Sequence, residues 1–201
     1  MPRTLGLTGN IACGKTAVGK MLLELGAERY IDADALVHQL YTAGQPVTHA
    51  IASAFGHDFL ATDGSVDRKK LGNLVFQDAQ ALQQLERIVH PAVTEALRLE
   101  LAQVSPSGIA IIDAVKLLEG ESGRFCQSKW LVLCSQEQQL QRLQLRSNLS
   151  AADALVRINA QTPATLKIPL VDEVIDNSGS LDNTRQQVIT AFRRFCEKFP
   201  A

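Results

Sequence analysis

Residues 9–16 are Gly-Asn-Ile-Ala-Cys-Gly-Lys-Thr and match the phosphate-binding pattern G-x-x-x-x-G-K-[ST] without a mismatch. Gly9 and Gly14 allow backbone conformations that a Cβ would penalise, so successive N–H groups can turn toward phosphate oxygens. Lys15 is expected to reach the β- and γ-phosphates of a nucleotide, and the Thr16 hydroxyl to bind Mg²⁺. The residues expected to contact the nucleotide here are Gly9, Asn10, Ile11, Ala12, Cys13, Gly14, Lys15, Thr16 and Ala17.

The segments on either side of this loop have the order that such a site requires. Residues 4–8 form a strand-like run before the loop, and residues 16–25 carry apolar side chains three and four positions apart, as a helix does. The phosphates would then lie at a helix N-terminus, where the dipole and the free N–H groups favour anions. A chance glycine loop is the alternative, which this order disfavours.

Two carboxylates follow the second strand-like run. Asp32 and Asp34 come directly after Tyr30 and Ile31, and ligands of open parallel sheets collect at the carboxyl ends of the strands. If the chain stays extended, both side chains face the same space. Either one is a candidate catalytic base, which would accept the proton of an attacking hydroxyl. The alternative is that Asp34 caps a helix over residues 35–40.

A third carboxylate ends another apolar strand. Residues 109–112 are Ile-Ala-Ile-Ile and lead into Asp113, a pattern typical of the acid that holds Mg²⁺ together with the hydroxyl of the phosphate loop. We therefore expect Asp113 and Thr16 to be the metal ligands, although a strand-end aspartate can also be a turn former. Lys116 and Glu119 could line an acceptor pocket or be solvated.

Basic residues gather in the last third of the chain. Arg142 and Arg146 are four positions apart and share one face of a predicted helix, and Arg157 and Lys167 follow. We interpret the helix–loop–helix over about residues 142–165 as a lid, whose arginines cover the triphosphate and neutralise charge in the transition state. The alternative is a solvated charged face.

Cys13 and Asn177 are further candidates near the nucleotide. Cys13 lies beside a helix N-terminus, which can lower the pKa of a thiol, so its oxidation could block nucleotide binding. The alternative for Cys13 is a small residue that fits the loop. Asn177 lies in a turn after the last strand and could contact the nucleotide base, or serve the turn alone.

Composition narrows the class of protein. With 201 residues, of which 46% are apolar and 20% charged, the chain suits one globular α/β domain. A formal net charge of −1 gives no sign of a nucleic-acid or membrane-surface partner, and no apolar run approaches the roughly 18 residues of a membrane span. The four cysteines form no C-x-x-C pair and no metal cluster with the histidines. We expect reduced thiols, a cytoplasmic location and, from the direct entry into the first strand, no signal peptide.

Apolar strand-like runs alternate with helical patterns along the whole chain, which predicts an α/β fold of the P-loop NTPase type. Its parallel five-stranded sheet would be flanked by helices. No repeat or linker interrupts the chain, so we expect a single domain over residues 1–201. The strand-like runs lie at residues 5–8, 29–31, 109–112, 130–134 and 173–175.

Several helices have recognisable ends or breaks. Pro91 should kink or split the helix that contains it. Ser150, with an acid three residues later, resembles an N-terminal cap, and Ser180 or Asp182 could cap the last helix. Residues 56–67 are the most loop-like stretch. Helices are expected over residues 81–104, 136–145, 151–160 and 181–195.

In the order of its motifs, the chain closely resembles the dephospho-coenzyme A kinase family, nearly from end to end. The phosphate loop alone is shared by many kinases and NTPases, whereas the ordered combination is specific. The motifs that carry the resemblance are Gly-Leu-Thr-Gly leading into the loop, Ile31-Asp32-Ala33-Asp34, Asp63-Gly64 with Asp67-Arg68, His90-Pro91, Asp113 with Leu117-Leu118-Glu119, Gln139 with Arg142 and Arg146, Gln161, Asp172, and Ile175-Asp176-Asn177.

The resemblance implies transfer of the γ-phosphoryl group of ATP to the ribose 3′-hydroxyl of dephospho-CoA, with Mg²⁺ bound, by a monomer or small homo-oligomer. Asp32 or Asp34 would supply the base, with Asp34 favoured, and Lys15 and Arg142 would act on the phosphates. Residues 60–105 would form a helical acceptor-binding section beside the arginine lid. The residues implied on the nucleotide side are Arg142, Arg146 and Asn177, and those on the acceptor side are Asp34, Arg68, His90 and Leu117.

The chain departs from the family pattern at three places. The phosphate loop has Asn-Ile-Ala-Cys where the family more often has Gly-Ile-Gly-Ser, which should be tolerated because Gly9 and Gly14 remain. His38 stands where an arginine is frequent, and residues 114–116 replace the usual Val-Pro stretch. Because of the last change, the resemblance does not fix the acceptor contacts around Lys116, although it still implies the reaction type.

Two other functions compete with this interpretation. A P-loop kinase of another small hydroxyl or nucleotide acceptor would share the fold and the donor site. A GTP-dependent switch is disfavoured, because no asparagine precedes a lysine as in N-K-x-D and the lone D-x-x-G, Asp176 to Gly179, lies too late in the chain.

Overall fold

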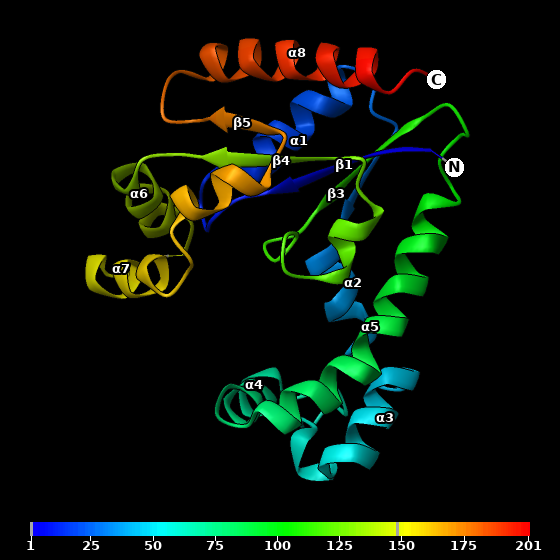
Figure 1. Cartoon of the computed structure of the whole chain (residues 1–201). Helices are drawn as coiled ribbons and strands as arrows, with labels where there is room; N and C mark the ends of the chain where they lie inside the picture. Colours follow the sequence, from blue (N-terminus) through cyan, green and yellow to red (C-terminus); the bar gives the residue numbers. More distant parts are fainter. Residues whose placement is uncertain (1, 148) are drawn as a thin grey trace. The chain divides into compact units, whose positions relative to one another are not determined.

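The computed structural model describes residues 2–147 and 149–201, and Figure 1 shows how its elements are arranged. Contacts within the chain divide it into two compact units. The first contains residues 2–32 and, residue 148 aside, 101–201, and the second contains residues 33–100. The sheet and the phosphate loop both belong to the first unit.

A parallel sheet of five strands, counted over the described residues, forms the centre of the first unit, and this confirms the predicted fold class. The strand order is β2-β3-β1-β4-β5, and every neighbouring pair is parallel. Each predicted strand is present, with ends that differ by one or two residues at most. The strands are β1 Arg3–Thr8, β2 Arg29–Asp32, β3 Ile109–Asp113, β4 Ser128–Leu133 and β5 Glu173–Asp176.

Two helices, α1 (Lys15–Glu24) and α8 (Leu181–Lys198), cover one face of the sheet and pack against each other. In Figure 1, α8 runs alongside the strands. Leu5 and Leu7 alternate along β1 and point to this face with Trp130 of β4, and all three are fully buried. Because strands of a parallel sheet are covered on both faces, their sequences are almost continuously apolar.

The helices α6 (Gln136–Ser147) and α7 (Ala151–Asn159) follow β4 and pack on each other through a small apolar cluster. Ser150 caps α7 as predicted, because its hydroxyl accepts a hydrogen bond from the Asp153 N–H at 3.1 Å. Of the two caps proposed for α8, Ser180 is the one present. The loop predicted between α6 and α7 includes Asn148, which lies outside the described residues.

The second unit is helical and consists of α2 (Ala33–Leu40), α3 (Pro46–Phe55), α4 (Arg68–Gln77) and α5 (Ala79–Leu101). α5 continues through Pro91, so the predicted split is wrong. A proline removes one backbone donor, and a helix of 23 residues keeps its other bonds.

The sequence did not predict α3 and α4, although both have local start signals. Pro46 occupies the first turn of α3, and the Asp67 side chain caps α4 by accepting from the Lys69 and Lys70 N–H groups at 3.1 and 3.0 Å. The predicted loop between them contains a short 3₁₀ helix, His57–Phe59, and an isolated antiparallel bridge between Leu60 and Val66. No helix in the described part of the chain is long and apolar enough to cross a membrane.

Replacing Ile111 by alanine should lower the free energy of unfolding by about 2–5 kcal/mol, because it removes a fully buried side chain from the middle of β3. Urea unfolding followed by circular dichroism measures the change. Leu181→Ala, at a side chain that is 63% exposed, is the matched control and should change stability by less than about 0.5 kcal/mol. Equal losses in the two variants would contradict this assignment of the core.

Candidate active site

The phosphate loop joins β1 to α1 in a tight turn that depends on two glycines. Gly14 has a φ of +101°, and a Cβ there would lie 2.1 Å from Nδ2 of Asn177. A Cβ on Gly9 would lie 2.5 Å from the carbonyl oxygen of Val132. No side chain larger than hydrogen fits at either position without a shift of its neighbours. The predicted strand–loop–helix order is therefore present, with the loop packed closely against β4.

Ala12 is the only non-glycine residue in the described chain that has a positive φ, at +59°. An L-residue in this left-handed region carries a cost of roughly 1–2 kcal/mol, because its Cβ approaches the following carbonyl oxygen. The family more often has glycine at this position, so the alanine of this chain is accommodated with local backbone strain.

Side chains of α6 hold the carbonyl groups of the loop. Gln139 Nε2 donates to the Ile11 carbonyl at 2.8 Å, and Arg142 Nη1 donates to the Ala12 and Cys13 carbonyls at 3.3 and 3.1 Å. Because the N–H and C=O of one peptide group point in opposite directions, the Ile11 and Cys13 carbonyls held by α6 direct the N–H groups of the same peptides, those of Ala12 and Gly14, away from these bonds and toward the space where a phosphate would lie. Arg142 thus supports the loop in addition to lying beside it.

Asn177 is a second support for the loop. Its Nδ2 donates to the Cys13 carbonyl at 2.8 Å, while its Oδ1 accepts from the Thr184 hydroxyl at 3.0 Å. The residue is 2% exposed, so its side chain is engaged within the protein. The predicted contact between Asn177 and a nucleotide base stays a prediction.

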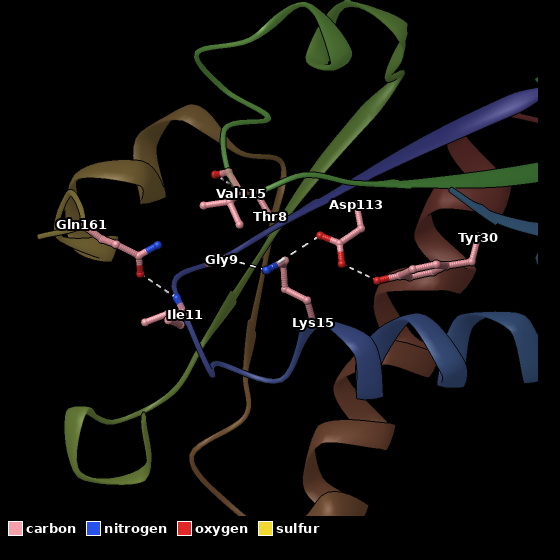
Figure 2. A network of polar contacts seen from close by, with 8 residues as sticks. All are labelled: Thr8, Gly9, Ile11, Lys15, Tyr30, Asp113, Val115 and Gln161. Carbon is pink, nitrogen blue, oxygen red and sulfur yellow. Dashed lines mark hydrogen bonds and ion pairs between the residues drawn. The ribbon is translucent and has the colours of Figure 1, made fainter. Parts of the chain in front are cut away.

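The segment that follows α7 is also tied to the loop. Gln161 Oε1 accepts from the Ile11 N–H at 2.7 Å (Figure 2), and Asn10 Nδ2 donates to the Thr162 carbonyl at 3.0 Å. The helix pair that we interpret as a lid is therefore connected to the loop at both of its ends.

A cavity of about 540 Å³ opens over the loop. It brings together most of the residues that the sequence assigns to the nucleotide, and it adds Leu145. Both predicted lid arginines reach it, so positive charge faces the phosphate-binding backbone from α6. The lining residues are Asn10, Ala12, Cys13, Gly14, Lys15, Thr16, Arg142, Leu145 and Arg146.

Lys15 and Asp113 meet at the end of the sheet, as Figure 2 shows. Lys15 Nζ lies 3.8 Å from Asp113 Oδ1 and donates to the Gly9 carbonyl at 3.4 Å. Asp113 is 7% exposed, and its Oδ2 accepts a hydrogen bond from the Tyr30 hydroxyl. Burial and this hydrogen bond raise the pKa of Tyr30 well above its usual range, so Tyr30 is a neutral donor at physiological pH.

The Cys13 thiol does not have the lowered pKa that its position beside a helix N-terminus suggests. Its side chain is 1% exposed, and burial raises the pKa of the thiol to about 11 despite the opposing effect of Lys15. The expected lowering of the pKa by the helix N-terminus is therefore wrong, because desolvation outweighs it. Cys13 belongs to the apolar core under the loop, which favours the alternative of a small residue that fits.

The two carboxylates after Tyr30 lie on different elements. Asp32 is the last residue of β2 and pairs in register with Asp113 on β3. Asp34 lies in the first turn of α2, which begins at Ala33. The chain does not stay extended from Asp32 to Asp34, so the premise that placed both on one side is wrong. Asp34 lies inside α2 and not at its cap position.

The predicted acceptor residues are distributed over both units. Arg68 begins α4 and His90 lies in α5, both in the second unit. Leu117 belongs to the first unit and is fully buried; its Cδ2 would lie 2.6 Å from a Cβ on Gly6. The predicted contact between Leu117 and the acceptor stays a prediction.

The atypical segment after Asp113 is fixed to β1. The Ala114 N–H donates to the Leu7 carbonyl at 3.1 Å, and the Thr8 hydroxyl donates to the Val115 carbonyl at 3.1 Å (Figure 2). These bonds use backbone groups, which explains why the segment tolerates a change of sequence.

Sequence reasoning gave no role to three residues that organise the site: Tyr30, Gln139 and Gln161. The two glutamines are among the motifs that carry the family resemblance, but nothing in their local pattern indicates the loop as their partner. Tyr30 stands directly before Ile31-Asp32 and resembles an ordinary strand residue.

The sheet order, the loop and the strand-end acid define the class as a kinase of the P-loop type. A family model described as CoaE, dephospho-CoA kinase, matches residues 3–183, and the chain belongs to this family. The dephospho-CoA kinase of Carboxydothermus hydrogenoformans is 39% identical over 95% of this chain and 93% of that protein. The enzyme of Symbiobacterium thermophilum is 43% identical over 96% of this chain and 82% of that protein.

Solved structures share the fold of this chain. The crystal structure of TT1252 from Thermus thermophilus matches with a TM-score of 0.79 and 30% identity, and the match covers 96% of this chain and 97% of that one. Shikimate kinase from Acinetobacter baumannii matches with a TM-score of 0.52 and 14% identity over 100% of this chain and 97% of that one, which shows the shared fold alone.

Replacing Ala12 by glycine should raise the free energy of unfolding by about 1 kcal/mol, because glycine removes the Cβ that opposes the left-handed backbone. Thermal unfolding should show a Tm higher by roughly 2–4 °C for a chain of this size. Ala17→Gly, inside α1, is the matched control and should lower the Tm, because glycine is a poor helix former. A lower Tm in both variants would show that Ala12 is not strained.

Proposed function

We propose that the chain transfers the γ-phosphoryl group of ATP to the ribose 3′-hydroxyl of dephospho-CoA. Family membership supports the reaction itself, which is the ATP-dependent phosphorylation of dephospho-CoA that completes coenzyme A biosynthesis. The geometry of the phosphate loop supports the binding of ATP as phosphoryl donor. Gln139 and Arg142 hold the loop carbonyls from α6, and Lys15 is held at the mouth of the loop by the Gly9 carbonyl. In this proposal, the loop N–H groups bind the phosphates of ATP.

We propose Mg²⁺ as the metal ion and Thr16 and Asp113 as its protein ligands. Both supply oxygen atoms, which Mg²⁺ prefers, and Thr16 lies in the first turn of α1, the helix that would receive the phosphates. The described residues contain no group of three or more His, Cys, Asp or Glu side chains that could hold a metal ion. This suits Mg²⁺ in a kinase, which keeps several waters and takes further ligands from the nucleotide phosphates. When bound, the ion would neutralise charge on the phosphates.

Positive side chains would supply the rest of the charge stabilisation. Lys15 has its amine between the Gly9 carbonyl and Asp113, at the mouth of the loop where β- and γ-phosphates would lie. Arg142 and Arg146 line the same cavity. A guanidinium near the phosphates would stabilise the charge that spreads over the equatorial oxygens in the transition state. We propose the helix pair over about residues 142–165 as the lid that carries these arginines.

We propose Asp34 as the base that accepts the proton of the 3′-hydroxyl, with Asp32 as the other candidate. Asp32 stands beside Asp113 on the neighbouring strand, a position that suits support of the metal site. Asp34 is two residues later in the chain, within a helix, and the family resemblance favours it.

The acceptor would be bound by Asp34, Arg68, His90 and Leu117, with residues 60–105 as the acceptor-binding section of one catalytic domain. Burial raises the pKa of Tyr41, and Arg68 opposes this effect, so Arg68 already interacts with an aromatic hydroxyl in the second unit. An arginine in such a place is suited to bind a phosphate of the acceptor.

We propose a cytoplasmic enzyme, a monomer or small homo-oligomer, that needs neither nucleic acid nor membrane. All four cysteines are free thiols, in keeping with a reducing compartment.

A coupled kinase assay tests the proposed acceptor. Rates would be compared on dephospho-CoA, adenosine, nucleoside monophosphates and shikimate, with and without Mg²⁺, and the new phosphate would be located on the product. A preference for dephospho-CoA with phosphate on the 3′-oxygen is expected. Preference for another acceptor would favour a P-loop kinase of a different small molecule.

Lys15→Ala should lower kcat by roughly 10²–10³-fold or more, because it removes a charge that acts on the transferring phosphoryl group. Lys20→Ala, at an exposed position further along α1, is the control for a lysine lost from the same helix and should retain activity. Steady-state kinetics with thermal melts of both variants separate catalysis from folding. Near-normal turnover in Lys15→Ala would mean that the loop does not act on the phosphates.

Asp34→Asn should lower kcat by roughly 10²–10⁴-fold, the usual worth of a general base, and change ATP affinity only a few-fold. The matched variant Asp32→Asn should lose less kcat and more of its Mg²⁺ dependence, because Asp32 neighbours Asp113. A larger loss of kcat in Asp32→Asn would reverse the choice of base.

A further inference from the structure

Tyr30 links the two residues that we propose as metal ligands. Its hydroxyl donates to Oδ2 of Asp113, and a hydrogen bond from the Thr16 side chain acts to lower its pKa, against the larger effects of burial and Asp113. Thr16 is on α1, Asp113 ends β3, and Tyr30 comes from β2. A single hydroxyl group therefore joins side chains from two different elements at the mouth of the phosphate loop.

The Asp113 carboxylate is held on both of its oxygen atoms. Lys15 Nζ lies 3.8 Å from Oδ1, on the side of the phosphate loop, and the Tyr30 hydroxyl binds Oδ2 from the opposite side (Figure 2). Two contacts on different oxygens fix the rotation of a carboxylate, whereas one contact leaves it free to turn. The Tyr30 bond would persist if Lys15 moved toward a bound phosphate, because it acts on the other oxygen of the carboxylate.

The Tyr30 ring occupies a space that glycine leaves open on α1. A Cβ on Gly19 would lie 2.2 Å from Cε2 and 2.7 Å from Cδ2 of the ring. Gly19 lies inside α1, where glycine is less favourable than alanine by about 1 kcal/mol. The ring thus rests directly on the backbone of the helix that carries Thr16, and its hydroxyl has a fixed position relative to that helix.

We propose that Tyr30 is a positioning residue of the metal site, whose hydroxyl holds the Asp113 carboxylate and the Thr16 hydroxyl in the arrangement that a Mg²⁺–nucleotide complex requires. This inference rests on the proposed roles of Thr16 and Asp113. Hydrogen-bond partners of metal ligands are typically worth 10- to 100-fold in metal affinity or activity, because they orient the ligand atoms. Tyr30 does not itself touch substrate or metal in this proposal.

Tyr30→Phe tests the inference, because it removes the hydroxyl and keeps the ring. Calorimetric titration with ADP, in Mg²⁺ and separately in EDTA, measures the factor by which Mg²⁺ tightens nucleotide binding. We expect this factor to fall by roughly 10-fold in Tyr30→Phe, with the affinity in EDTA and the Tm nearly unchanged. Tyr41→Phe, in the second unit, is the matched control and should keep the wild-type factor.

A second pair of variants separates the hydroxyl from the packing of the ring. Gly19→Ala should displace the ring and reduce the Mg²⁺ factor although the hydroxyl is still present. Adding Tyr30→Val to Gly19→Ala should relieve the clash and restore the Tm, but not the Mg²⁺ factor. A restored factor in this double variant would overturn the role of the hydroxyl.

The outcomes distinguish this inference from the proposal on which it rests. If Mg²⁺ does not tighten ADP binding to the wild type, the proposed metal site fails and the inference falls with it. If Mg²⁺ tightens ADP binding by the same factor in the wild type and in Tyr30→Phe, the proposed metal site stands and the role of Tyr30 alone is overturned. A reduced factor in Tyr30→Phe with an unchanged Tm supports both.

Discussion

The parallel pairing of β1 with β3 is the constraint on which the site depends. Its register places Leu7 opposite Asp113, so the acid that ends β3 lies one strand away from the loop that begins after Thr8. A slip of one residue would turn Asp113 to the other face of the sheet. Burial of Leu5, Leu7 and Ile111 opposes such a slip, because all three side chains would have to repack on the other face of the sheet. The contact of Lys15 with Asp113 is therefore a consequence of how the hydrophobic core packs.

The backbone of the phosphate loop imposes a second requirement. A loop that turns its N–H groups toward a ligand must satisfy its carbonyls elsewhere, because buried polar groups without partners are costly. Gln139, Arg142 and Asn177 supply the donors from α6 and from the turn after β5. The loop is thereby shaped in advance of any ligand, and one of the side chains that shape it, Arg142, also brings positive charge close to the phosphates.

Much of the fold could be predicted because its signals are local. The five strands are apolar runs, the loop has a fixed pattern, and Ser150 and Ser180 cap helices within three residues of themselves. What escaped prediction depends on distance along the chain or on burial. Arg142 and Asn177 bind Cys13 across 129 and 164 residues, so their use as supports follows only from the tertiary structure.

Two local arguments failed for identifiable physical reasons. The helix dipole at Cys13 was judged without the desolvation that dominates in the core. The pair Asp32 and Asp34 was judged as extended chain, although a helix begins between them at Ala33. The cavity gathers most of the loop and lid residues that were named from the sequence, whereas Tyr30, which contacts Asp113 from β2, went unnoticed.

The burial of Cys13 has a consequence for the design of inhibitors. A cysteine inside an ATP-binding loop suggests an attachment point for electrophilic compounds that would compete with the nucleotide. The Cys13 sulfur, however, is in the core beneath the loop and protonated near neutral pH, so a warhead held in the cavity would meet backbone and not a thiolate. A covalent compound would have to reach a side chain that is only 1% exposed, and reversible compounds that use the arginine-lined side of the cavity suit this enzyme better.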